Sequence, residues 1–441
     1  MSRRRIVFIL LLSFVLFFSS NTFAVEAKRT VLPNGLILLQ SRQSYLPVVH
    51  VVLLIKASAF DEPPDKAGLA NLTSSLLMEG TTHRTSDQIS EEIEFIGAEL
   101  GASTSRDYTV VSLSVLKKHL NKGFELFSDI LLNPAFSEEE IIRKKDLIKG
   151  SLKQAEDDPS FVAARAFRKA IYGEEHPYGR LVSGSAETID RITRDDIVDF
   201  YKTFYRPNNA ILAVVGDITM DETRALLKQF LGNWKSKDIP SRRSYTVRRQ
   251  KEIKIIKIDR DLTQANIMLG HLSVKRSDPD YYKLQVMNYI LGGGGFASRL
   301  MTKIRDDMGL AYDVHSFITS NLDIGFFRVG VQTKNPSAKE VIRVIVDEMK
   351  RMQEQSVTEQ ELKDAKAYLT GSFPRRIDSM AKIANFLVLT ELYGLGLDYD
   401  RKYPEYINSV TREDIKQVAR KYLQPQAYTL VVVGKIKETG L

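Results

Sequence analysis

The sequence predicts an α+β protein made of two related domains, each a mainly antiparallel sheet packed by helices. Three observations lead to this prediction. The chain has 441 residues, whereas domains commonly hold about 100–200. A long segment of the first half recurs in the second half. Strands and helices are expected in neighbouring groups, which favours α+β over a doubly wound parallel sheet.

The repeat joins residues 189–218 to residues 407–436 without a gap. Its identical positions include the pairs Ile189/Ile407, Thr193/Thr411, Arg194/Arg412, Asp196/Asp414, Ile197/Ile415, Pro207/Pro425, Val214/Val432, Val215/Val433, Gly216/Gly434 and Ile218/Ile436. A second match relates residues 137–151 to residues 358–372. In both copies a threonine is placed to cap a helix with an acidic first turn, and an apolar run before the glycine predicts a buried strand. Chance similarity of two helix–strand units explains such a match poorly, so we infer an internal duplication.

Residues 1–24 have the pattern of a signal peptide. Arg3, Arg4 and Arg5 precede an apolar run from Ile6 to Phe18, and a polar stretch ends at Ala24. We expect cleavage after Ala24 or Ala27 and export to the periplasm. A membrane anchor is the alternative, but the run is shorter than the roughly 20 residues of a bilayer span, so no stable membrane insertion is expected after cleavage.

The remaining chain divides into an N-terminal domain, residues 25–235, a linker, residues 236–252, and a C-terminal domain, residues 253–441. The linker region is polar and basic and contains Pro240. It could be interpreted as a nucleic-acid patch, but it has no regular aromatic interleaving and no nearby binding module, so we expect a solvated linker.

In the first domain, Asn34-Gly35 predicts a turn before a strand at residues 36–39, and a second strand is expected at 48–60. Helices are expected at residues 66–79, 86–100, 117–131 and 137–155.

Composition excludes several kinds of site. The chain has no cysteine, which removes thiolate zinc sites, iron–sulfur clusters, cysteine nucleophiles and disulfides. Its net charge of +8 falls to +5 for a chain that starts at Val25. This mild excess argues against nucleic-acid binding as the main function.

The expected helix at residues 66–79 carries two distinct faces. Leu69, Leu72 and Leu76 form an apolar face, while Asn71, Ser74 and Ser75 form a small polar one. This segment, DEPPDKAGLANLTSSLLMEGT, together with LPNGLILL, HPYGRLVSGSAETI and VVGDI, resembles the insulinase/pitrilysin/mitochondrial processing peptidase family. The resemblance covers nearly the whole chain after the signal peptide.

The resemblance implies a zinc site that this sequence lacks. Active members carry His-x-x-Glu-His on this helix and a glutamate on a later one. The corresponding positions are Asn71, Ser74, Ser75 and Ser151. Hydroxyl and amide groups are poor zinc ligands at neutral pH, so no metal or other cofactor is expected in this chain. The chain has six histidines, and no two of them form an i, i+4 pair. The remaining alternative is a zinc site assembled from histidines that are far apart in the sequence.

The second domain keeps another feature of the family. Gly292, Gly293, Gly294 and Gly295 lead into a segment with Arg305 and Tyr312. No Gly-Lys-Ser/Thr follows, so a phosphate site is not expected. By themselves the residues fit a flexible turn, an arginine paired with a neighbouring aspartate, and a core tyrosine. The resemblance implies instead that Arg305 and Tyr312 bind substrate and its developing negative charge.

The resemblance therefore predicts a pseudo-enzyme, not catalytic alone. It would be the substrate-binding subunit of a heterodimeric zinc metalloendopeptidase, whose partner carries the intact motif and the zinc. Peptide or unfolded-protein substrates would bind by strand addition to a sheet edge. Two alternatives remain. One is a stand-alone peptide-binding or assembly protein on the same scaffold. The other is a protease with an unrecognised site, although no Gly-x-Ser-x-Gly motif occurs.

Overall fold

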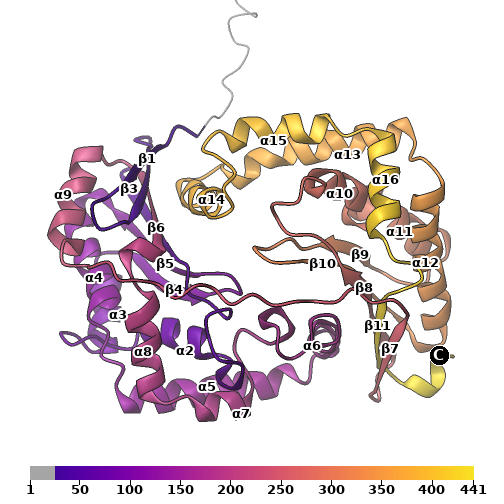
Figure 1. Ribbon diagram of the computed structural model, residues 1–441, viewed down its shortest axis with the longest axis horizontal. Helices are drawn as coiled ribbons and strands as arrows, with labels where there is room; N and C mark the ends of the chain where they lie inside the picture. Colours follow the sequence, from indigo (N-terminus) through magenta and orange to yellow (C-terminus); the bar gives the residue numbers. More distant parts are fainter. Residues whose placement is uncertain (1–24) are drawn as a thin grey trace, which may run out of the picture.

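The computed structural model describes residues 25–441, which form two sheets surrounded by helices (Figure 1). The predicted signal peptide, residues 1–24, lies outside the described residues. The first sheet has the strand order β1-β2-β6-β3-β5-β4, and the second has the order β7-β11-β8-β10-β9. When β7 is aligned with β2, the strand order of the second sheet is the same as that of the first sheet without its edge strand β1. In each sheet one pair is parallel, β2 with β6 and β7 with β11, and the other pairs are antiparallel. The predicted α+β fold is confirmed.

The strands are β1 (Lys28–Val31), β2 (Ile37–Arg42), β3 (Val48–Ile55), β4 (Glu99–Thr104), β5 (Thr109–Leu116), β6 (Ala210–Gly216), β7 (Lys254–Asp259), β8 (Gln264–Leu272), β9 (Val314–Ile318), β10 (Phe326–Lys334) and β11 (Thr429–Gly434). The helices of the first half are α2 (Leu69–Leu76), α3 (Ser86–Phe95), α4 (Leu120–Leu132), α5 (Glu138–Ala155), α6 (Pro159–Tyr172), α7 (Ala186–Arg191), α8 (Arg194–Phe204) and α9 (Met220–Leu231). Those of the second half are α10 (Tyr281–Asn288), α11 (Arg299–Met301), α12 (Ala338–Glu354), α13 (Glu359–Ser372), α14 (Met380–Leu392), α15 (Tyr399–Asn408) and α16 (Arg412–Tyr422).

The repeated caps form as the sequence predicts. Thr193 accepts a hydrogen bond from the N–H of Asp196 at 3.2 Å, and Thr411 accepts one from Asp414 at 3.1 Å. Each acid also accepts from the backbone N–H of its threonine, which completes a capping box at the start of α8 and α16. The buried strands β6 and β11 follow these helices, one in each half.

Some predicted boundaries are wrong. The strand expected at residues 48–60 ends at Ile55, because Ser58 and Asp61 close a turn in which the N–H of Ser58 donates to the Asp61 carboxylate at 2.9 Å. The helix expected at residues 86–100 ends at Phe95, and residues 99–104 form the edge strand β4. Pairing with β5 overrides the helical pattern there.

Each half of the chain contributes one helix that packs against the sheet of the other half. α6 packs against β8 and β11 of the second sheet, and α14 packs against β3 and β6 of the first (Figure 1). The two helices occupy equivalent places in the duplication, because α5 and α13, the helices before them, begin at the matched residues. Each sheet is therefore covered on one face by helices of its own half and on the other by a helix of the opposite half.

A polar network also joins the halves. Tyr178 donates to the Asp107 carboxylate at 2.6 Å, and the N–H of Asp323 donates to the Tyr178 oxygen at 3.1 Å. Residues 236–252 form neither helix nor strand and are mostly exposed. Within them, Arg242 donates to the carbonyl of Asp107 at 3.0 Å and lies 4.3 Å from the centre of the Phe60 ring. Part of the linker region therefore packs on the seam between the halves.

No helix within residues 25–441 combines the length and the apolar character that a membrane crossing needs.

Candidate functional site

The helix α2 is held at its start by a buried carboxylate. Gly68 adopts a φ of 101°, and a Cβ there would lie 2.7 Å from Ile189 and 2.9 Å from the Ser183 carbonyl. Glu62, which is fully buried, accepts hydrogen bonds from the N–H groups of Gly68 and Ala70 at 3.1 and 3.0 Å. Burial raises the pKa of Glu62 to about 8. The sequence pattern does not indicate Glu62, because this residue lies six positions before Gly68, beyond the few positions that capping patterns cover.

Ser74 lies at the centre of a chain of hydroxyl groups. Its side chain is buried, donates to the carbonyl of Asn71 at 3.0 Å, and accepts from Thr104 of β4 at 2.8 Å. Thr104 lies 2.7 Å from the hydroxyl of Thr109, which donates to the carbonyl of Ala57 at 2.8 Å. The position that would hold a catalytic glutamate in active relatives is thus occupied by a hydroxyl with its hydrogen bonds satisfied inside the protein.

The side chains at the other motif positions either form hydrogen bonds within their own helix or are partly or fully exposed. Ser75 donates to the carbonyl of Leu72 at 2.9 Å, and Asn71 is half-buried. Ser151 is exposed on α5, which packs against α2. Just beyond α2, Glu79 forms ion pairs with Arg143 and Lys144 of α5, so that this acid is already neutralised.

The residues at these positions do not fit a zinc ion. Zinc in proteins takes imidazole, thiolate or carboxylate ligands, and these positions offer three hydroxyls and an amide. Within residues 25–441, no group of three or more His, Cys, Asp or Glu side chains is placed to hold a metal. Two histidines have carboxylate partners within 3 Å, His83 with Asp129 and His315 with Asp313, both at 2.7 Å. We therefore assign no metal chemistry to this helix.

The glycine segment is packed rather than loose. Gly292 and Gly293 end a π-helical turn, residues Tyr289–Gly293. A Cβ on Gly292 would lie 2.7 Å from the hydroxyl of Ser316 on β9. Ser316 in turn donates to the Asn288 side chain at 2.8 Å, which fixes the turn against the strand. Gly295, with a φ of +57° and open space around it, is the position that turns the chain.

Arg305 and Tyr312 have different surroundings. Arg305 donates to the carboxylate of Asp306 at 3.3 Å, and its guanidinium lies 4.6 Å from the centre of the Phe296 ring. Arg305 thus contacts the residue that follows the four glycines. Tyr312 is 88 % exposed, so the expectation of a core tyrosine is wrong. It makes no hydrogen bond to another described side chain.

Tyr312 belongs to a groove between α6 and the second sheet. The groove has a volume of about 310 Å³ and is lined from α6, β8, β9 and β10. Arg328, Asn266 and Ser160 line it with Tyr312 and were not singled out in the sequence. Arg328 and Phe326 lie on the same face of β10, which α6 covers, and burial lowers the pKa of Arg328. No carboxylate pairs with Arg328 among the described residues, although Asp313, which lies 2.7 Å from His315, also lines the groove.

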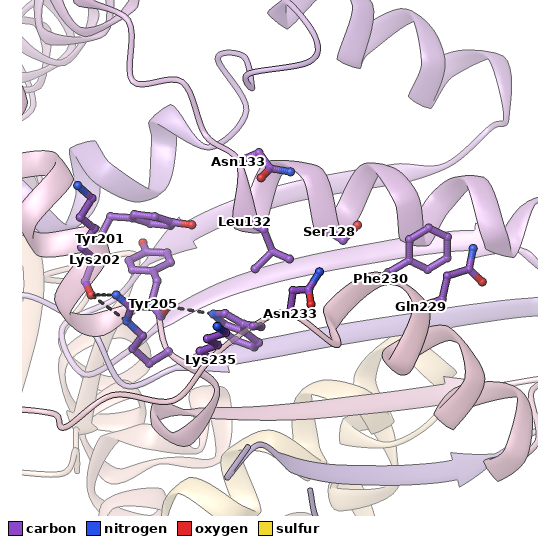
Figure 2. Close-up of a pocket in the computed structure, with 12 residues that line it drawn as sticks. Ser128, Leu132, Asn133, Tyr201, Lys202, Tyr205, Gln229, Phe230, Asn233 and Lys235 are labelled. Carbon is purple, nitrogen blue, oxygen red and sulfur yellow. Dashed lines mark hydrogen bonds between the residues drawn. The ribbon is translucent and has the colours of Figure 1, made fainter. Parts of the chain in front are cut away.

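A second cavity has no such chemistry (Figure 2). It measures about 620 Å³ and lies against α4, α8 and α9, away from α2 and from the glycine segment. Trp234 donates to the carbonyl of Tyr205 at 3.0 Å, and Arg206 donates to that of Lys202 at 2.8 Å, whereas the Tyr205 hydroxyl is buried without a hydrogen-bond partner. Its lining contains no histidine or carboxylate. It is not a candidate catalytic site.

The two sets of predicted site residues do not meet within one chain. Asn71, Ser74 and Ser75 lie on α2 in the first half, whereas the glycine segment, Arg305 and Tyr312 lie in the second half (Figure 1). Among the described residues, no hydrogen bond joins the two sets, and neither of the two cavities described above is lined by members of both.

Comparisons with known proteins agree with the fold and with the order of the two halves. A family model described as insulinase, peptidase family M16, matches residues 38–182, and one described as the peptidase M16 inactive domain matches residues 191–369. An uncharacterized zinc protease of Streptomyces coelicolor is 28 % identical over 93 % of this chain and 90 % of its own length. One of Bacillus subtilis is 25 % identical over 92 % and 98 %.

A solved structure gives the same result. The crystal structure described as a peptidase M16 inactive domain from Pseudomonas fluorescens superposes with a TM-score of 0.86 at 27 % identity, covering 93 % of this chain and 98 % of that one. The family models together span most of the chain, in the order expected from the duplicated halves. The chain therefore belongs to the insulinase family of peptidases, M16.

Proposed function

We propose that this protein is a zinc-less, substrate-binding subunit of an exported heterodimeric metallopeptidase whose partner carries the zinc. One observation supports this most strongly. On α2 the buried Ser74 is bound into the hydroxyl chain through Thr104, so the helix is built around a residue that cannot activate water.

The second half of the chain, which keeps the family's Arg305 and Tyr312, supports the same proposal. Arg305 and the exposed Tyr312 offer a forked cationic donor and a phenolic donor to a peptide carbonyl that becomes negative. Among the described residues no hydrogen bond joins them to α2 of their own chain, and in the proposed complex the motif helix of the second subunit would face them. The edge strand β4, which lies beside α2, offers unpaired backbone groups to an extended peptide.

Reconstitution tests the proposal. The purified chain is mixed with an exported paralogue that has an intact His-x-x-Glu-His helix, and cleavage of an unfolded protein is followed. We expect no stoichiometric zinc and no cleavage from this chain alone, and a rate with both chains well above that of the paralogue. Peptide binding without any gain in cleavage would support the stand-alone binding protein instead. Cleavage by this chain alone would overturn both.

A further inference from the structure

A buried carboxylate on α15 contacts the first described residue of the chain. The backbone nitrogen of Val25 donates to Oδ2 of Asp400 at 2.8 Å. Both residues are buried, with 8 % of Val25 and 7 % of Asp400 exposed. The contact joins positions 375 residues apart, one beside β1 of the first half and one on a helix of the second.

The charge of Asp400 is not compensated by any described side chain. No lysine, arginine or histidine of residues 25–441 forms an ion pair with it, and its second oxygen, Oδ1, is buried without a hydrogen-bond partner. A carboxylate in the interior is costly unless it is paired and hydrogen-bonded. One amide N–H satisfies only part of that requirement. A positively charged group with several donors, placed at the Val25 nitrogen, would satisfy the rest.

Hydrolysis of one peptide bond creates that group. Addition of water across the Ala24–Val25 bond leaves a carboxylate on Ala24 and an ammonium, with three N–H donors, on Val25. The sequence alone allows cleavage after Ala24 or after Ala27. Cleavage after Ala27 would remove Val25 and leave Asp400 without its donor.

We propose that this chain is processed between Ala24 and Val25, and that the new Val25 ammonium forms a buried ion pair with Asp400. The proposal rests on the export part of the proposed function and is independent of the partner subunit. Its consequence is structural. Arg29 of β1 also pairs with Glu391 of α14 at 3.0 Å, so the start of the processed chain ties the first sheet to two helices of the second half.

The cleavage position is tested on the full chain, expressed with its N-terminal segment and purified from the periplasm. N-terminal sequencing and intact mass are expected to give a chain that begins at Val25. A chain that begins at Lys28, or at any other residue, overturns the proposal. This measurement needs neither partner nor substrate, so it is separate from any failure of the peptidase assay.

The ion pair is tested by unfolding two forms of the protein. One begins at Val25, and the other carries Gly-Ser before Val25 and so has an amide at that nitrogen. Asp400→Asn is expected to increase the unfolding equilibrium constant at least tenfold more in the first form than in the extended one. Asp398→Asn, which removes a nearby carboxylate paired with Lys402, is the control and should affect both forms equally. Equal effects of Asp400→Asn on the two forms would refute the ion pair.

Discussion

The hydroxyl of Thr104 lies 2.8 Å from that of Ser74, and this hydrogen bond links the edge strand β4 to the helix α2. The link leads us to expect that changing α2 alone does not restore the zinc-binding motif. A longer, charged side chain at position 74 would have to displace Thr104 from a buried site, where an unpaired charge is costly.

The first prediction follows from this contact. The variant N71H/S74E/S75H is expected to bind no tight zinc, because Ser151 leaves the third protein ligand missing, and to unfold at a lower temperature than the wild type. Metal analysis after dialysis and thermal unfolding measure the two effects. The same variant with Ser151→Glu is the comparison. Stoichiometric zinc in the triple variant would show that the third ligand lies elsewhere.

Arg305 provides the second prediction. Arg305→Ala is expected to remove most of the rate gained on mixing with a catalytic paralogue, because one donor to a developing negative charge contributes roughly 3–4 kcal/mol. Size-exclusion chromatography should show that the complex still assembles. Lys303→Ala, in the same turn and paired with Asp307, is the matched control and should keep the gain. Wild-type rates in the arginine variant would remove Arg305 from the site.

Glu62 predicts a pH dependence of stability. Its pKa is raised by burial to about 8 in the folded state, whereas the unfolded carboxyl titrates near its ordinary 4.5. The folded state therefore holds this proton to higher pH, and the associated stability is lost as the pH rises from 4.5 towards 8. Relative to Glu62→Gln, the wild type should lose on the order of 1–4 kcal/mol over this range. Denaturant unfolding at several pH values measures the difference, and parallel profiles for the two proteins would contradict it.

The close packing around Gly292 predicts that a side chain at this position lowers the stability of the protein. Gly292→Ala places a methyl group 2.7 Å from the Ser316 hydroxyl and 2.9 Å from Leu300, so we expect a loss of about 1–3 kcal/mol. Gly371→Ala is the control, because that helical glycine has open space around it and alanine favours helix by about 1 kcal/mol. Urea unfolding compares the two. Equal stability of both variants would mean that the π-helical turn rearranges freely.

The last prediction concerns the polar network of Tyr178, Asp107 and Asp323 that joins the two halves. Tyr178→Phe leaves the buried Asp107 carboxylate without its 2.6 Å hydrogen bond and removes the acceptor of the Asp323 N–H. We expect a loss of about 1–3 kcal/mol and faster proteolysis near residues 319–325, which lie between β9 and β10. Thermal unfolding and limited proteolysis measure this. Tyr201→Phe, which removes a hydrogen bond to Leu131 within the first half, should not change the cleavage pattern.

Much of the fold could be predicted because it depends on local patterns. The caps at Thr193 and Thr411 and the apolar runs ending at Gly216 and Gly434 specify helix–strand units without reference to distant residues. The residues that stand at the zinc-motif positions of α2 can likewise be read directly from the amino-acid sequence. The helix expected at residues 86–100 ends at Phe95, because pairing with β5 decides the segment that follows.

The sequence by itself therefore determined the duplicated α+β architecture, the family resemblance and the absence of zinc ligands from the motif helix, since each depends on residue types at short spacing. Only the tertiary structure decided the packing of α6 and α14 on the sheet of the opposite half, the buried contact of Val25 with Asp400, the anchoring of α2 by Glu62 and the exposure of Tyr312. These depend on contacts between residues far apart in the chain, whose geometry is set by packing rather than by local pattern.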